Sequence, residues 1–185
     1  MKKYLFSLMT IVMVAMASVC FVSCGDDDDN GNGSNNSTSS GVQVSAGYGY
    51  FHKNSSTSWE FYFCSLDMGS PSIMGKTIDM IIIDLKTENG SEDIPVGEFT
   101  GCFAVDIQKG MKVSQSGESE EGTYYESGGR STTTGKLTIK KNGGNNYTVS
   151  YAGVNLYNDD SKTPAIKDAS FSFTGALVDY PWYDE

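Results

Sequence analysis

Hydrophobic residues recur with a period of two along most of the chain behind residue 41. These runs are rich in Val, Ile, Thr, Tyr and Phe, and Gly, Asn and Asp separate them. Such alternation is typical of strands with one buried face, whereas an amphipathic helix repeats every 3.6 residues. We therefore expect eight or nine strands and no helix. The expected strands are 42–51, 58–67, 77–86, 97–108, 111–114, 133–141, 146–156 and 167–178, with a further short strand near 123–126.

Two hairpins are the best defined of these elements. The first joins 133–141 to 146–156 through a turn rich in Gly and Asn, and the second joins 146–156 to 167–178 across the loop 158–168. Each of the three strands has one apolar and one polar face. This pattern indicates an antiparallel sheet with one face on a core.

Two other runs, 60–66 and 78–85, are apolar on both faces. We expect them to be central strands whose second face is covered by a loop or by the C-terminal segment. The fold class that follows is all-β, with an antiparallel two-sheet β-sandwich as the expected architecture and a lipocalin-like β-barrel as the alternative.

The N-terminus has the features of an export signal. Two lysines precede an apolar run over 4–22, and small residues follow. A transmembrane anchor is the alternative, but the run contains Ser and Thr, and no Lys or Arg follows it to stop transfer. We expect residues 1–23 to be removed as a signal peptide.

The segment Phe21-Val22-Ser23-Cys24-Gly25 resembles the lipobox of bacterial lipoproteins. The resemblance implies that Cys24 becomes the lipidated N-terminus, and two or three acyl chains anchor a protein stably. The next residues, Asp26, Asp27, Asp28 and Asp29, are similar to the surface-export signal of Bacteroidetes-type outer-membrane lipoproteins. The expected location is therefore the outer membrane, facing the cell surface, with the periplasmic face as the alternative.

The closing part of the chain also carries a resemblance. Gly135 to Ile139, Tyr147 to Val149 and Phe171 to Gly175 form a pattern similar to the ends of small uncharacterised Bacteroidetes lipoprotein domains. Those domains are all-β, so the resemblance supports the fold class only.

Composition divides the mature chain in two. Residues 24–41 comprise the lipidated cysteine, the acidic tag and a flexible tether of Asn, Gly, Ser and Thr, and residues 42–185 are expected to form one domain. Without Lys2 and Lys3, the 13 basic residues become 11 against 23 acidic ones, a formal charge of −12. Nucleic-acid phosphates repel such a surface, so we expect no nucleic-acid partner.

Cys64 and Cys102 are the thiols that remain once Cys20 leaves with the signal and Cys24 takes lipid. Each lies in an expected strand, opposite a face formed by Phe residues. If both Phe faces point to one core, the two sulfurs lie on the outside of their sheets and could form a disulfide. Two separate, buried thiols are the alternative.

Patterns for catalysis and metal binding are missing from the sequence. His52 is the single histidine, and Gly-x-Ser-x-Gly, Walker, Rossmann and His-Glu-x-x-His patterns do not occur. One His and two Cys cannot furnish a closed zinc site. The acidic segments 118–121 and 155–160 lack the spacing of a calcium loop. We expect no enzymatic activity, no metal and no cofactor.

Four carboxylates on expected strands are the residues on which one enzymatic activity, glycoside hydrolysis, would depend. They are Glu60, Asp79, Asp84 and Asp106. The chemistry needs two carboxyl groups about 5 to 10 Å apart, one with a raised pKa.

Aromatic side chains form the more plausible ligand site, because Trp and Tyr rings stack on sugars. Packing within the sheets is the alternative role of each of them. The candidate binding residues are Trp59, Tyr124, Tyr125, Tyr157, Tyr180, Trp182 and Tyr183. The long polar loops 114–132 and 158–168 are the expected surroundings of such a site.

The sequence thus favours a non-enzymatic, surface-tethered lipoprotein that binds an extracellular ligand, a glycan or a protein. One alternative is a structural or accessory subunit of a pilus or outer-membrane complex with an envelope protein as partner. A second alternative is a lipocalin-like carrier of a small apolar molecule.

Overall fold

Strands dominate the part of the protein that the structure, a computed structural model, describes: residues 36–113, 122–158 and 161–181. These residues belong to one compact unit. The strands are β1 (Asn36–Ser40), β2 (Tyr48–Ser55), β3 (Ser58–Cys64), β4 (Thr77–Lys86), β5 (Gly97–Phe99), β6 (Phe103–Lys112), β7 (Thr123–Glu126), β8 (Lys136–Gly143), β9 (Asn146–Leu156) and β10 (Ile166–Asp179). A short 3₁₀ helix, η1 (Pro71–Ile73), precedes β4. The expected all-β class is confirmed.

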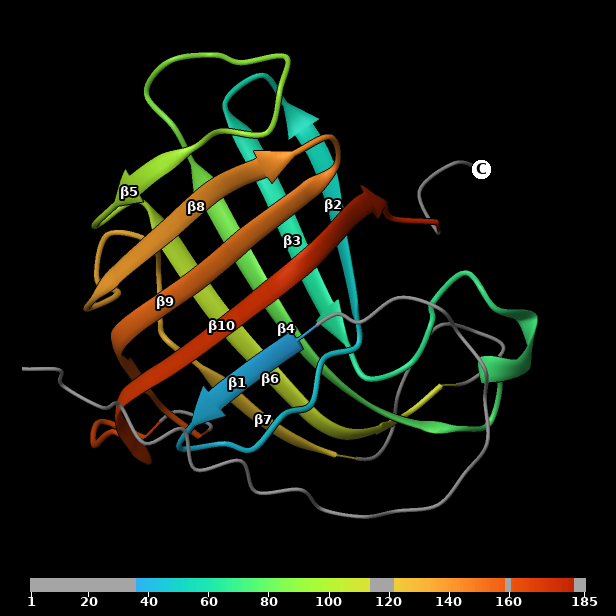
Figure 1. Cartoon of the computed structure of the whole chain (residues 1–185). Coiled ribbons are helices and arrows are strands. Elements are labelled where there is room, and N and C mark those ends of the chain that lie inside the picture. The colour runs from blue at the N-terminus through green and yellow to red at the C-terminus, as the bar shows by residue number, and fades with distance from the viewer. Residues whose placement is uncertain (1–35, 114–121, 159–160, 182–185) are drawn as a thin grey trace, which may run out of the picture. The chain divides into compact units, whose positions relative to one another are not determined.

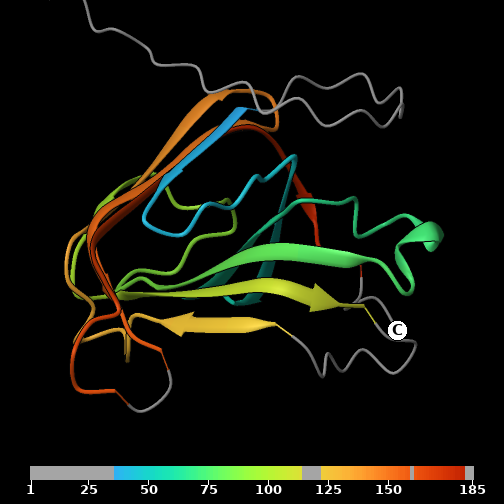
Figure 2. The ribbon, with the colours of Figure 1, turned by 90° about the horizontal axis from the view of Figure 1, so that it is seen from below.

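The strands form one folded sheet with the order β5-β8-β9-β10-β2-β3-β4-β6-β7, and β1 pairs with β10 (Figure 1). Its two halves are joined by β10, which pairs antiparallel with β9 along most of its length and parallel with β2 through residues 177–179. Figure 2 shows the halves as two layers, with β8, β9 and β10 in one and β4, β6 and β7 in the other. The arrangement is sandwich-like.

One core lies between the two layers. Alternate residues of β3, β4 and β6 meet alternate residues of β8, β9 and β10 there, as the period-two pattern requires. Phe63 of β3 packs against Phe171 and Phe173 of β10, with ring centroids 5.1 and 5.0 Å apart. Side chains from both layers therefore fill the space between them.

Both expected hairpins are confirmed. β8 and β9 pair antiparallel around a turn that contains Gly143 and Gly144. Both glycines have positive φ, of 130° and 53°, which residues with a Cβ rarely adopt. β9 and β10 pair antiparallel across the second loop.

The second face of β3 and β4 is also covered, as expected because both strands carry apolar residues on both faces. Tyr62, Cys64 and Met80 belong to a second buried cluster on the outside of these strands. Two segments supply its cover: the loop around η1, with Met68 and Ile73, and the C-terminal end of the described chain, with Tyr180. We call this group the outer cluster.

The expected strand 97–108 is wrong as a single element. Residues 97–99 form β5, which pairs with β8, and β6 begins at Phe103 and pairs with β4 in the other half of the sheet. Gly101, with φ of +66°, lies at the crossing. The expected strand at 111–114 is also not separate, because β6 continues to Lys112. Apolar and polar residues continue to alternate where the chain crosses from one half of the sheet to the other, so the pattern does not reveal the crossing.

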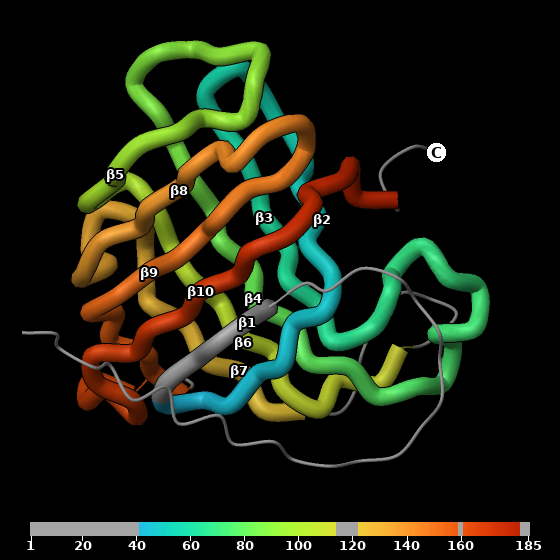
Figure 3. Tube along the Cα trace, in the orientation of Figure 1, coloured from blue at the N-terminus to red at the C-terminus, as the bar shows by residue number. Residues whose placement is uncertain are grey.

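The start of the domain differs from expectation as well. Residues 42–47 form no ladder, although Val42, Val44 and Ala46 are buried in the main core, and the strand begins at Tyr48. The path of the chain between β1 and β2 can be followed in Figure 3. Residues 36–40, assigned to the flexible tether, instead form β1 against residues 170–174 of β10. A polar segment of this kind gives no hydrophobic signal, because backbone hydrogen bonds alone define it.

The signal peptide at 1–23, the lipidation site Cys24 and the acidic tag Asp26–Asp29 lie outside the described residues. Within the described ranges, no helix has the length and apolar character needed to cross a bilayer.

Candidate functional site

A pocket of about 370 Å³ opens where the ends of several strands and loops meet, and we call it the aromatic pocket. Phe51, Trp59 and Tyr147 contribute its rings, and Trp59, Tyr147 and Leu177 are 1, 5 and 1 % exposed. Its remaining lining is mostly polar and charged: Glu92, Asp93, Ile94, Lys141, Asn145, Val178 and Asp179. Buried rings beside polar groups are typical of small-molecule sites.

The β2–β3 hairpin positions two of the three rings of this pocket, and Tyr147 comes from β9. Phe51 and Trp59 lie on neighbouring strands with ring centroids 6.1 Å apart. Lys53, opposite Trp59 in the ladder, holds its Nζ 5.5 Å from the Trp59 ring centroid and 2.6 Å from Glu92 Oε2. The ion pair therefore links the hairpin to the loop 92–94 that lines the pocket.

The indole of Trp59 has an unusual environment. Its Nε1 is buried and has no hydrogen-bond partner among the residues that the structure describes. A buried donor without an acceptor costs about 1 to 3 kcal/mol, and most buried polar groups in folded proteins have a partner. A ligand oxygen that reached this nitrogen would remove that cost.

A second group of functional side chains lies on the outside of β3, β4, β6 and β7, and we call it the acidic face. The ladder places Glu60 opposite Asp84, and Asp106 opposite Glu126. Three of the four carboxylates singled out in the sequence thus share one face. The fourth, Asp79, instead accepts a hydrogen bond from the backbone N of Gly110 at 2.8 Å, at the irregularity between β4 and β6.

Burial and neighbouring charges change the acidity of this face. Burial raises the pKa of Asp106 to about 6, and the charge of Asp84 adds to the shift. Burial also raises the pKa of Asp84, against which Arg130 acts in the opposite direction. Tyr124 donates a hydrogen bond to Asp106, and burial raises the pKa of the Tyr124 hydroxyl to about 12. The face can therefore exchange a proton near pH 6.

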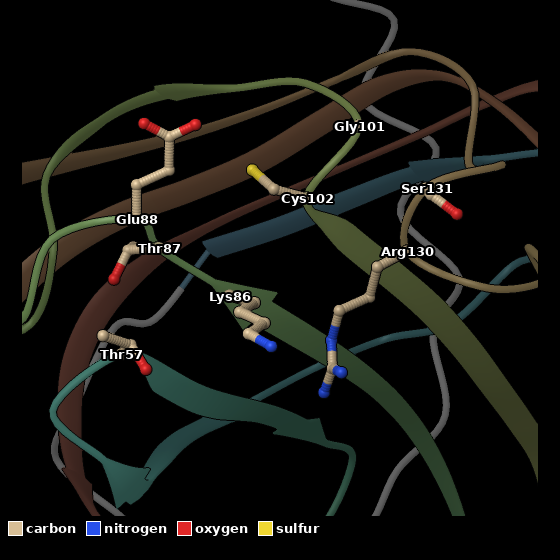
Figure 4. A pocket seen from close by; sticks show the side chains of 8 residues that line it. All are labelled: Thr57, Lys86, Thr87, Glu88, Gly101, Cys102, Arg130 and Ser131. Carbon is tan, nitrogen blue, oxygen red and sulfur yellow. The ribbon is translucent and has the colours of Figure 1, made fainter.

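A third hollow, of about 600 Å³, lies at the end of β4 beside the acidic face, and we call it the arginine hollow (Figure 4). Lys86 and Arg130 are its cationic residues. The other lining residues are Thr57, Thr87, Glu88, Gly101, Cys102 and Ser131.

The loop that carries Arg130 is anchored at its base. Ser127 accepts a hydrogen bond from the backbone N of Val105 at 2.8 Å, and its Oγ lies 2.9 Å from Oγ1 of Thr133. Both hydroxyl residues are buried. The loop therefore holds Arg130 over Asp84, with Nη2 3.7 Å from Oδ1.

The aromatic residues singled out in the sequence have different fates. Trp59 is a buried wall of the aromatic pocket rather than an exposed ring. Tyr180 is also buried, stacked on Tyr62 in the outer cluster with centroids 4.1 Å apart, which is the packing role given as the alternative in the sequence analysis. Tyr124 is 39 % exposed and lies on the acidic face.

The other aromatic candidates contribute less to a site. Tyr125 is half-buried against the main core, and Tyr157 is half-buried and forms a backbone bridge with Glu126. Trp182 and Tyr183 lie outside the described residues. The sequence analysis did not single out Phe51, Tyr147, Lys86 or Arg130 as site residues, since no binding motif surrounds them.

The disulfide that the strand pattern allowed is not formed in the structure, where both cysteines are free. Cys64 lies opposite Met80 near the start of β4, whereas the carbonyl of Cys102 accepts a hydrogen bond from Lys86 N at the end of β4. These points on β4 are about 20 Å apart along the strand, and a disulfide needs Cα atoms within about 7 Å. Cys64 belongs to the outer cluster, and Cys102 packs against the main core.

Among the described residues, no group of three or more His, Cys, Asp or Glu side chains is placed to hold a metal ion. The segment 118–121 and residues 159–160 lie outside those residues. Comparison with known families, curated proteins and solved structures finds no match to this chain.

Proposed function

We propose that this protein is a non-enzymatic lipoprotein, anchored in the outer membrane through Cys24, that binds an extracellular glycan in the aromatic pocket. The observation that carries the proposal is the buried indole of Trp59, which lines the pocket and whose Nε1 has no partner among the described residues. The acidic tag Asp26–Asp29 supports a position facing the cell surface.

The chemistry of the pocket suits a sugar. The C–H face of a sugar ring packs on aromatic rings, and Phe51, Trp59 and Tyr147 provide these. Sugar hydroxyls both donate and accept hydrogen bonds, and Asn145 and Asp93 at the pocket offer an amide and a carboxylate for this purpose. A hydroxyl oxygen is also a suitable acceptor for the Trp59 N–H.

The test is a glycan array followed by affinity electrophoresis with a soluble chain that begins at Gly25. This start removes the anchor and keeps β1, which pairs with β10. We expect retention by at least one polysaccharide, and about tenfold weaker binding by Asn145→Ala and by Trp59→Phe, which lacks the N–H. Lys140→Gln is the control, because Lys140 lies on the β8–β9 hairpin that carries Asn145 but outside the pocket. Failure to bind any glycan would refute the proposal.

Glycoside hydrolysis is the second candidate, because Asp84 and Asp106 share one face and the pKa of Asp106 is raised to about 6. Incubation of the soluble chain with any glycan that it retains, followed by measurement of new reducing ends, tests it. New reducing ends that form with the parent protein and not with Asp106→Asn would show that the protein hydrolyses the glycan rather than only binding it. The filled core between the two layers argues against the lipocalin-like carrier.

A further inference from the structure

Lys86 and Arg130 bring two cationic groups to one hollow of a strongly acidic protein. Lys86 follows the buried Leu85, so it points outward from β4, and Arg130 reaches the same hollow from the loop after β7. Figure 4 shows the Lys86 ammonium directed toward the Arg130 guanidinium. Among the described residues, Lys86 forms no ion pair. Two like charges that line one hollow favour an anion between them.

The guanidinium of Arg130 has unused hydrogen-bonding capacity. Its Nε is buried and has no partner among the described residues, and its ion pair with Asp84 is a single contact of 3.7 Å. A guanidinium carries five N–H donors in a plane that matches the two oxygens of a carboxylate. Because hydrogen bonds at the base of the loop hold Arg130 in place, little ordering is needed when a ligand binds.

The charges around the hollow select a singly charged ligand. Glu88 lines it, and Asp84 lies beside Arg130, so the two cations are already partly balanced. The mature chain as a whole is acidic, and it repels multiply charged phosphates. A carboxylate carries one charge and has the shape for two-point contact with Arg130.

The other lining residues indicate which class of molecule carries the carboxylate. Thr57, Thr87 and Ser131 present hydroxyls, and Cys102 is the one apolar side chain described there. A sugar offers hydroxyls to such a surface, whereas a peptide would find no pocket for apolar side chains. The volume, about 600 Å³, is in the range of ligand pockets.

We propose that the arginine hollow binds the carboxylate of an acidic sugar, with Arg130 in two-point contact and Lys86 as the second charge. The site is separate from the aromatic pocket, because the two share no lining residue. The proposal therefore does not depend on neutral glycans binding beside Trp59.

The experiment is calorimetric titration of the full-length protein, as the cell produces it and purified in mild detergent, with the monosaccharide galacturonate, which carries one carboxylate. The methyl ester of the same sugar is the matched ligand without charge. We expect the acid to bind at least about tenfold more tightly than its ester. We also expect Arg130→Gln to lose about tenfold or more, and Arg130→Lys and Lys86→Gln to lose less.

Two control variants distinguish a contact in the arginine hollow from a general effect of charge and from binding in the aromatic pocket. Lys140→Gln removes a positive charge from exposed β8 and should leave binding unchanged, and Trp59→Phe should also leave it unchanged. Lys86 is exposed, so its variant keeps the test valid should Arg130 variants fail to fold.

Several outcomes would overturn the inference. Equal binding of acid and ester would exclude a charge contact, and equal losses in Lys86→Gln and Lys140→Gln would indicate a general charge effect. Stronger competition by inorganic phosphate or sulfate would make the hollow a general anion site. Tighter binding of a tripeptide with a free C-terminal carboxylate would exclude the sugar.

Discussion

The outer side of β3 and β4 has two ends that differ in what lies over them. At one end, the outer cluster places Tyr62, Cys64 and Met80 under η1 and Tyr180, all at 8 % exposure or less. At the other end, Glu60 and Asp84 lie in the same two strands, half-buried, and the described residues supply no comparable apolar cover there. One pair of strands therefore continues from a packed surface to a polar one within a few residues.

The two ends differ in what their side chains contribute to the stability of the fold. Apolar side chains at the covered end remove surface from water, which is the main stabilising contribution to folding. Carboxylates at the open end lose hydration and gain little in return, as the raised pKa values of Asp84 and Asp106 show. Substitutions at the two ends should change stability in opposite directions.

The largest effect is expected from Tyr180→Ala at the covered end. Tyr180 stacks on Tyr62 and meets Tyr50 edge-on with centroids 5.8 Å apart, so its removal exposes the outer cluster. We expect a loss of about 3 kcal/mol in the free energy of unfolding, measured by urea denaturation. Val178→Ala, at an exposed position of β10 two residues before Tyr180, is the control and should cost less than about 0.5 kcal/mol. A small loss in Tyr180→Ala would mean that the cover is not needed.

The next effect compares the two cysteines. Cys64→Ser places a hydroxyl in a fully buried apolar site and should cost about 2 kcal/mol. Cys102→Ser, at a partly exposed site, should change the free energy of unfolding by less than about 0.5 kcal/mol. A disulfide would instead make the two substitutions equally destabilising under oxidising conditions. Urea denaturation with and without reductant distinguishes these results.

Cys64 also illustrates which parts of the fold can be predicted from sequence. Its strand is apolar on both faces, which indicates a covered second face, and the structure places Met68, Ile73 and Tyr180 there. Alternation and turn glycines likewise predict the two C-terminal hairpins. These features follow from local patterns of burial, which the sequence records directly.

Local patterns in the sequence do not show which strands pair with one another. The burial pattern of residues 42–46 alternates as in a strand, yet the segment forms no ladder, and β1 has no hydrophobic pattern at all. The parallel contact of β10 with β2 depends on chain segments far apart in sequence. A hydrophobic period of two indicates which face of a segment is buried. It does not indicate which backbone groups are hydrogen-bonded.

The candidate site was predictable only in part, for the same reason. Trp59, Tyr124 and the strand carboxylates are residue types that attract notice, but the sequence did not show that Trp59 is buried. Arg130 was missed because it lies in a polar loop, and its importance comes from a fold-dependent position over Asp84. Ser127 and Thr133, which anchor that loop, resemble any loop hydroxyls in the sequence.

A smaller effect, of opposite sign, is expected from Asp106→Asn at the open end. The folded-state pKa of about 6 lies above the ordinary value of 3.8, so the stability that Asp106 contributes is present below pH 4 and is lost as pH rises through 6. At pH 7.5, Asp106→Asn should be more stable than the parent by about 1 to 2 kcal/mol, a figure reduced for partial exposure. The difference should vanish near pH 4.

A pH series of urea denaturation curves from pH 4 to 8 measures this effect. Glu98→Gln is the control, because Glu98 is an exposed carboxylate paired with Lys136 at 2.9 Å. Its free energy of unfolding should stay within about 0.5 kcal/mol of the parent throughout. Destabilisation by Asp106→Asn at pH 7.5 would show that its hydrogen bond with Tyr124 outweighs the cost of burying its charge.

The smallest effect is expected from Arg130→Gln. The guanidinium is partly exposed, its contact with Asp84 is long, and its buried Nε has no described partner, so its loss should change the free energy of unfolding by less than about 0.5 kcal/mol. Thermal and urea denaturation at pH 7.5 measure this. A loss above about 1 kcal/mol would assign Arg130 a structural role in holding Asp84. Because hydrogen bonds anchor the loop that carries Arg130 and its own contact with Asp84 is long, Arg130 is the position at which stability and the proposed binding should separate most clearly.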